Sequence, residues 1–100
     1  MSARPIVFHP EAAEEAEAAL TWYRQRSPKA AAGFLAEIED AIEAIAANPE
    51  RWPAFGYRTR RCLLRRFPFL IVYRELPEAI QVLAVAHGRR RPGYWKQRGR

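Results

Sequence analysis

The first half of the chain combines one short apolar run with a long stretch rich in alanine and glutamate. The run Ile6–Phe8 predicts a first strand. The stretch from Pro10 to Gln25 predicts a helix, because alanine and glutamate favour helices and proline is tolerated in the first turn. We expect the inward stripe of this helix to consist of Ala13, Ala16, Leu20 and Tyr23, with Ala12 and Ala19 beside it.

A second helix is predicted from Pro28 to about Ala47. Ser27 is a suitable N-cap for it, and Pro28 suits the first helical position. The helix should end at Asn48, because a residue that precedes proline avoids the helical conformation. Its apolar residues recur every three or four positions, and the two helices should form an antiparallel hairpin. The expected apolar stripe is Leu35, Ile38, Ile42 and Ile45, widened by Phe34 and Ala41.

The second half of the chain changes to a period of two. Residues 50–59 contain proline and glycine without a clear period, so we predict a loop there, although it carries three aromatic residues. Residues 60–67 alternate arginine with apolar side chains, and 69–74 are rich in β-branched and aromatic residues. Residues 80–87 are aliphatic on both faces, which is typical of a central strand.

These elements predict an α+β protein with the order strand, helix, helix, strand, strand, strand. Consecutive strands joined by tight turns pair antiparallel, so the last three strands should form a meander. The antiparallel helical hairpin should pack on one face of the sheet to give two layers, with the other face partly open. For a chain of 100 residues we expect a single domain over 1–100, with a basic tail at 88–100.

Charge is distributed unevenly along the chain. Residues 1–50 hold four basic and nine acidic residues, a net charge of −5, whereas residues 51–100 hold thirteen and two, a net charge of +11. The basic half is almost entirely arginine, whose planar fork of donors suits carboxylates and phosphates. One interpretation is an anionic partner for one face of the protein, and the other is a solvated basic surface.

Few residues could carry familiar enzyme chemistry. His9, Cys62 and His87 do not have zinc-like spacing, so we predict no metal site and no cofactor. A single cysteine cannot form an internal disulfide and suits a reducing compartment, so we expect a cytoplasmic protein. No apolar run is long enough to span a bilayer, and we expect no contact with a membrane.

A basic and aromatic cluster follows the last predicted strand. One interpretation is metal-independent RNA cleavage, in which a histidine or tyrosine moves protons and arginines steady the phosphorane. A second is a docking surface, where arginines and aromatic side chains are frequent hot spots. A third is a solvated tail without function. The cluster consists of His87, Arg89, Arg90, Arg91, Tyr94 and Trp95.

Three motifs carry a resemblance to a known family. They are Asn-Pro-Glu-Arg-Trp-Pro at 48–53, Phe-Pro-Phe-x-x-x-Tyr at 67–73 and His-x-Arg-Arg-x-Pro-x-Tyr-Trp at 87–95. Together with the order of elements, they resemble the RelE/ParE superfamily of bacterial type II toxins over nearly the whole chain. The resemblance implies a small toxin that a cognate antitoxin holds silent.

The resemblance includes two branches with different activities. RelE-like members cut mRNA in the ribosomal A site, whereas ParE-like members inhibit DNA gyrase and have no established nuclease site. Where the nucleases carry two cations, this chain has Leu63 and Leu70, and leucine cannot stabilise a phosphorane. The ParE-like branch, a non-enzymatic gyrase inhibitor that blocks replication, is therefore favoured. The alternatives are a RelE-like mRNA endoribonuclease and a basic nucleic-acid-binding module. The nuclease would use Arg61, His87, Arg90 and Tyr94.

The resemblance also implies two macromolecular partners. The first is a cognate antitoxin with an acidic, partly disordered segment, which would form a hetero-oligomer with this chain. The second is the target, either DNA gyrase or the ribosome. Expected antitoxin contacts are Leu20, Tyr23, Trp52 and Phe55. Expected target contacts are Arg65, Arg66, His87, Arg89, Arg90, Arg91, Tyr94 and Trp95.

Overall fold

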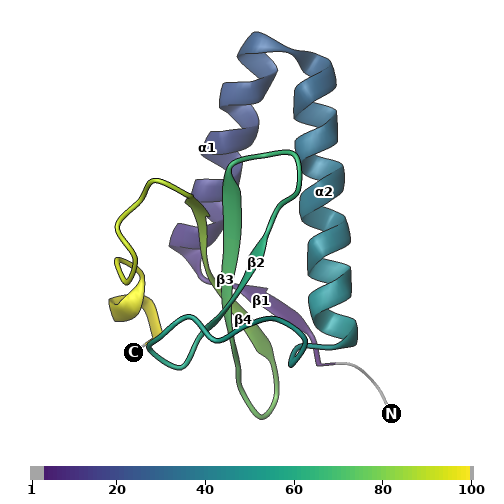
Figure 1. Ribbon diagram of the computed structural model, residues 1–100. Coiled ribbons are helices and arrows are strands. Elements are labelled where there is room, and N and C mark those ends of the chain that lie inside the picture. Colours follow the sequence, from purple (N-terminus) through teal and green to yellow (C-terminus); the bar gives the residue numbers. More distant parts are fainter. Residues whose placement is uncertain (1–3, 100) are drawn as a thin grey trace.

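The structure is a computed structural model that describes residues 4–99, and it places two helices against one face of a four-stranded sheet (Figure 1). The strands are β1 (Ile6–Phe8), β2 (Arg60–Leu63), β3 (Phe69–Glu75) and β4 (Ile80–His87). The helices are α1 (Pro10–Arg26) and α2 (Pro28–Ala47), and a short 3-10 helix, Lys96–Gly99, follows β4. No helix in this described range is long and apolar enough to cross a membrane.

The sheet has the strand order β1-β4-β3-β2. The predicted antiparallel pairing of β2 with β3 and of β3 with β4 is confirmed. β1 lies parallel to β4 and pairs Ile6–Phe8 with Ile80–Val82. The fold is therefore the predicted α+β class, and its sheet is mixed because the N-terminal strand joins the last one.

A single residue, Ser27, separates the two helices and serves both of them. Its backbone N–H donates to the carbonyl of Tyr23 at 2.7 Å, which ends α1. Its hydroxyl accepts a hydrogen bond from the backbone N–H of Ala30 at 3.1 Å, which caps the start of α2. This shared cap produces the tight antiparallel hairpin that Figure 1 shows beside the sheet.

The buried stripes include Leu20, Ile38 and Ile45 as predicted, but one predicted position in each helix is exposed. In α1, Ala12 is completely buried and Ala13 is exposed. In α2, Phe34 is 2% exposed, whereas Leu35 is 41% exposed. The Phe34 ring packs against three other aromatic rings at centroid distances of 5.2 to 5.4 Å. This aromatic cluster, which joins the helices to the β2–β3 turn, consists of Tyr23, Phe34, Phe67 and Phe69.

The strand predicted over residues 60–67 is shorter than expected. β2 ends at Leu63, and the chain then turns toward α2. There the carboxylate of Glu37 accepts hydrogen bonds from the backbone N–H groups of Arg65 and Arg66. Because a helix side chain satisfies these donors, the backbone does not continue the ladder with β3.

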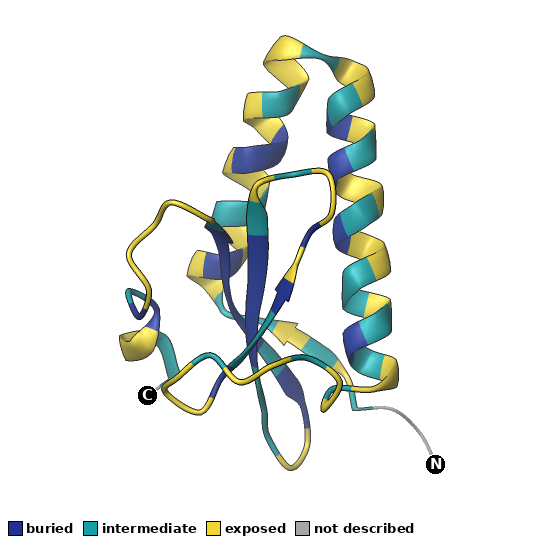
Figure 2. Ribbon diagram, viewed as in Figure 1, coloured by how far each residue is buried: buried dark blue, intermediate teal, exposed yellow. Residues whose placement is uncertain are grey.

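The expectation of a partly open second sheet face is wrong. On that face Leu70, Val72 and Leu83 are buried, as Figure 2 shows for the centre of the sheet. Trp95 covers them with 2% of its surface exposed, and its ring stacks on Phe55 at 5.1 Å. The predicted loop and the predicted tail therefore complete a second core. The last residue of that tail, at position 100, lies outside the described residues.

We predict that Trp95→Ala lowers the free energy of unfolding by about 3–5 kcal/mol, because it leaves a large cavity in this second core. Trp22→Ala is the matched control and should cost less than about 1 kcal/mol, since half of the Trp22 side chain is exposed. Urea unfolding followed by circular dichroism measures both values. Equal losses for the two variants would show that the C-terminal segment is not part of the core.

Candidate functional site

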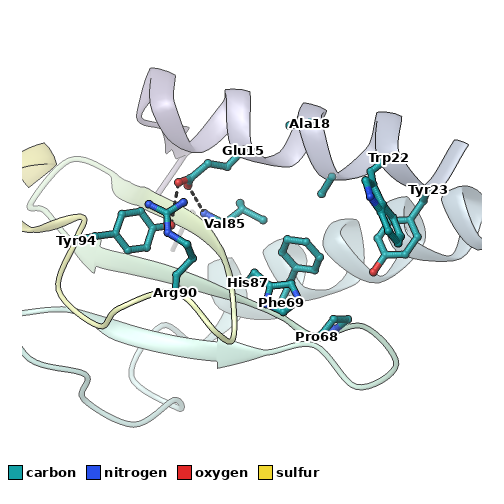
Figure 3. A pocket seen from close by; sticks show the side chains of 11 residues that line it. Glu15, Ala18, Trp22, Tyr23, Pro68, Phe69, Val85, His87, Arg90 and Tyr94 are labelled. Atoms are coloured by element: carbon teal, nitrogen blue, oxygen red, sulfur yellow. Dashed lines mark hydrogen bonds between the residues drawn. The ribbon is translucent and has the colours of Figure 1, made fainter. Parts of the chain in front are cut away.

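An apolar cavity of about 520 Å³ lies between α1 and the adjoining ends of β3 and β4. Figure 3 shows Trp22 and Tyr23 at one end of this cavity and Arg90 and Tyr94 at the other. The ring of Phe69 and the imidazole of His87 form part of its wall. They make an edge-to-face contact, with ring centroids 5.2 Å apart. The full lining is Glu15, Ala18, Ala19, Trp22, Tyr23, Pro68, Phe69, Val85, His87, Arg90 and Tyr94.

The cavity exists because β1 is too short to pair with the whole of β4. The ladder between β3 and β4 shifts register, so that Val82 faces Tyr73 while Ala84 faces Val72. Leu83 is therefore the extra residue of a β-bulge. Beyond it, no strand among residues 4–99 pairs with the outer edge of β4, and α1 lies along that edge instead (Figure 3).

Glu15 on α1 accepts the hydrogen bond of a backbone N–H group at this edge of β4. Its carboxylate accepts hydrogen bonds from the backbone N–H of Val85 at 3.0 Å and from the hydroxyl of Tyr94 at 2.8 Å. The guanidinium of Arg98 donates to both of its oxygens, at 2.9 and 3.0 Å. Arg98 also donates to the carbonyl of Leu83 at 2.9 Å, so one ion pair caps two backbone groups of β4.

These contacts determine the protonation of Tyr94. Burial, then the hydrogen bond to Glu15 and the negative charge of Glu15, raise the pKa of Tyr94 to about 12. Burial by itself would lower the pKa of Arg98, but the hydrogen bonds and charge of Glu15 outweigh burial and raise it. At neutral pH Tyr94 is thus a neutral phenol, and its hydroxyl donates a hydrogen bond to Glu15.

Arg90 stands at the mouth of the cavity. Its guanidinium carbon lies 3.9 Å from the centroid of the Tyr94 ring, within cation–π distance. His87, at the end of β4, accepts a hydrogen bond at Nδ1 from the backbone N–H of Arg89 at 3.1 Å. The turn after β4 therefore presents exposed arginine side chains beside an apolar hollow.

Two further exposed arginines, Arg65 and Arg66, lie in the β2–β3 turn at the same end of the sheet. The backbone N–H of Gly88 donates to the carbonyl of Pro68 at 2.8 Å, which joins the β2–β3 turn to the turn after β4. We call this surface the cationic rim. Within residues 4–99, Arg66 is its one member with a carboxylate partner, Glu37 at 3.6 Å. The cationic rim consists of Arg65, Arg66, Arg89, Arg90 and Arg91.

The structure separates the residues of the hypothetical nuclease. His87, Arg90 and Tyr94 line one cavity, but Arg61 does not line it. The guanidinium of Arg61 lies 4.8 Å from the ring of Phe55, which packs on the second face of the sheet. Because the Tyr94 hydroxyl donates to Glu15, His87 is the member of this set that lies beside Arg90 with a ring nitrogen able to move a proton.

The residues expected to contact partners do not form one surface. Trp95 and Leu20 are buried, so neither presents its side chain at the surface of this structure. Tyr23 lines the cavity beside α1, whereas Trp52 lines a separate groove of about 540 Å³ between α2 and β2. Phe55 is half-buried under Trp95. Tyr23 shares its cavity with Arg90 of the cationic rim, and Trp52 shares its groove with Arg65 and Arg66.

Glu15, Trp22 and Arg98 are site residues that the sequence analysis missed. Glu15 lies within the buried stripe of α1, at helical spacing from Ala12 and Ala19, and an acidic residue in such a stripe is a signal of a buried partner. Trp22 is 50% exposed and has a guanidinium, that of Arg26, 3.8 Å from its ring centroid.

Metal and thiol chemistry find no support at this site. In the part of the chain that the structure describes, no three histidine, cysteine or carboxylate side chains lie close enough together to hold a metal ion. Cys62 is buried, and burial raises the pKa of its thiol, which disfavours the reactive thiolate.

The fold and the site define a class of small basic α+β proteins that present an arginine-rich rim beside an apolar cavity. Residues 6–92 match the family described as "ParE toxin of type II toxin-antitoxin system, parDE". The chain therefore belongs to the ParE toxin family.

A solved structure supports the fold. The chain superimposes with a TM-score of 0.74 on a structure titled "Chromosomal ParDE TA system from P. aeruginosa", covering 85% of this chain and 96% of that chain. The two sequences are 19% identical, so the likeness bears on the fold alone. No curated protein matches the sequence.

The raised pKa of Tyr94 predicts a pH-dependent contribution to stability. The folded protein holds the Tyr94 proton more tightly than the unfolded chain, whose tyrosines have a pKa of about 10. The contribution is therefore complete below pH 10 and is lost as the pH rises toward 12. The wild type should lose more stability over this interval than Tyr94→Phe, as measured by urea midpoints at each pH. Identical losses would contradict the hydrogen bond to Glu15.

Proposed function

We propose that this ParE-family protein inhibits DNA gyrase by binding it through the cationic rim, without cutting a substrate. The observation that carries the proposal is the position of Arg90, an exposed guanidinium held beside an apolar cavity by an aromatic ring. Arginine and aromatic side chains next to a desolvated hollow are the usual hot spots of protein interfaces. The proposed target is a cytoplasmic enzyme, and the protein would act there.

Two leucines support binding over RNA cleavage. Leu70, which replaces an expected catalytic arginine, is buried on the second face of the sheet. Leu63, which replaces an expected lysine, is 59% exposed on β2 and carries no charge. The endoribonuclease and the basic nucleic-acid-binding module thus become outcomes to be tested against gyrase inhibition.

We further propose that a cognate antitoxin neutralises this protein by covering the cationic rim. The protein carries a net charge of +6, which favours an acidic partner. The apolar cavity and the exposed ring of Trp22 offer a place for apolar side chains of the same partner. An antitoxin segment that binds there would exclude gyrase by direct occlusion, in a hetero-oligomer with this chain.

We predict that the purified protein inhibits DNA supercoiling by gyrase, and that Arg90→Ala raises the half-inhibitory concentration about tenfold, a loss typical of a hot-spot arginine. Arg24→Ala, an exposed arginine near the end of α1, is the matched control and should retain full potency. A gel-based supercoiling assay measures both.

Three outcomes would count against this function. Full supercoiling at high excess of wild-type protein would overturn the proposed target. Cleavage of mRNA in a translating extract would favour the endoribonuclease. Binding to DNA or RNA that weakens steeply with salt, without an effect on gyrase, would favour the nucleic-acid-binding module.

For the antitoxin we predict that Trp22→Ala weakens binding of the adjacent gene's product by at least about tenfold, because an exposed tryptophan beside a cavity is a typical anchor. Leu35→Ala, which changes an exposed apolar residue on α2, should leave the affinity unchanged. Isothermal titration calorimetry with the purified partner measures both. The opposite pattern would place the antitoxin on α2.

A further inference from the structure

Glu15 receives more hydrogen bonds than any other side chain at the cavity. Its carboxylate accepts from the β4 backbone at Val85, from Tyr94 in the turn after β4 and from Arg98 in the 3-10 helix. Figure 3 shows it reaching from α1 across the cavity wall toward Tyr94 and Val85. The carboxylate therefore joins α1 to three points of the C-terminal part of the chain, each seventy or more residues away in sequence.

Tyr94 links this carboxylate to the cationic rim. Its hydroxyl donates a hydrogen bond to Glu15. The centroid of its ring lies 3.9 Å from the guanidinium carbon of Arg90. The ring cannot rotate away without breaking the 2.8 Å hydrogen bond to Glu15. Tyr94 thus provides a side-chain contact that helps to hold the Arg90 guanidinium at the cavity mouth.

Arg98 holds the other end of the same segment. Its side chain is 11% exposed and forms ion pairs with Glu15 at 2.9 Å and with Glu11 at 3.0 Å. Glu11 cannot replace Glu15, because it is 58% exposed and none of its hydrogen bonds in the described residues goes to β4 or Tyr94. Without the Glu15 charge, Arg98 would be a largely buried cation with one solvated partner.

We propose that Glu15 is a positioning residue, whose carboxylate fixes the segment 88–99 against the open edge of β4 and thereby holds Arg90 where it contacts the target. The role rests on the proposed function, because the target contact of Arg90 is part of that proposal. The anchoring of the segment by Glu15 is independent of which macromolecule Arg90 meets.

The first test measures the anchoring directly, by amide hydrogen exchange in the full chain. Glu15→Gln keeps the size of the side chain and removes its charge, and Glu17→Gln on the exposed side of α1 is the matched control. In Glu15→Gln the amides of Arg90, Lys96 and Arg98 should exchange at least about tenfold faster, while the amides of α2 keep wild-type rates. Unchanged exchange after the turn at Gly88 would overturn the proposal.

The second test separates positioning from a general loss of folded protein. Glu15→Gln should raise the half-inhibitory concentration for gyrase about tenfold alone, but less than about twofold in the Arg90→Ala background, because both changes remove the same contact. A merely structural role would give the same factor in both backgrounds and would overturn the proposal.

A second variant covers the case in which Glu15→Gln does not fold. Tyr94→Phe removes one donor to Glu15 without a change of charge, and it should speed exchange at Arg90 while Arg98 remains protected. Equal exchange at Arg90 in this variant and the wild type would overturn the link from Glu15 to the rim. If the wild type does not inhibit gyrase, the proposed function fails, and the exchange rates still decide whether Glu15 anchors the segment.

Discussion

The open edge of β4 is the constraint on which the rest of this structure depends. β1 pairs with Ile80–Val82 alone, and the bulge at Leu83 turns the following backbone groups toward α1. Buried backbone groups without a partner cost free energy, and an unpaired strand edge invites association with other chains. The fold satisfies this edge with a buried ion pair, Glu15 and Arg98, that bonds the backbone of β4.

The same ion pair couples the core to the surface that we assign to binding. The segment that carries Arg98 also carries Trp95, whose ring stacks on Phe55 over the second face of the sheet. The turn that precedes Trp95 then presents Arg90 at the cavity. Residues 88–99 supply both Trp95 to the core and three arginines to the cationic rim. A substitution there that changes the free energy of unfolding is therefore also expected to change the proposed binding of the target.

The sequence predicted the parts of the fold that local signals determine. The Ser27 cap between two amphipathic stretches and the turn signals at Pro68 and at Leu76 led to the correct order of elements, although the strand before Pro68 ends earlier than predicted. The parallel pairing of β1 with β4 and the closure of the second face depend on contacts between distant segments, for which a period in sequence carries no information. The site was found in part: the arginines after His87 were recognised from composition, but Glu15 was not, because its partners lie seventy or more residues away.

Two sets of arginines in this protein differ in their carboxylate partners. Arg4, Arg60 and Arg98 each meet a carboxylate, and these pairs fasten the ends of the sheet to the rest of the chain. Arg89, Arg90 and Arg91 meet none among residues 4–99, although Arg90 and Arg98 touch the same tyrosine ring. A cluster of like charges repels itself, and the fold gains nothing from holding three guanidinium groups in one exposed turn. Under the proposed function, these three charges serve a partner rather than the fold.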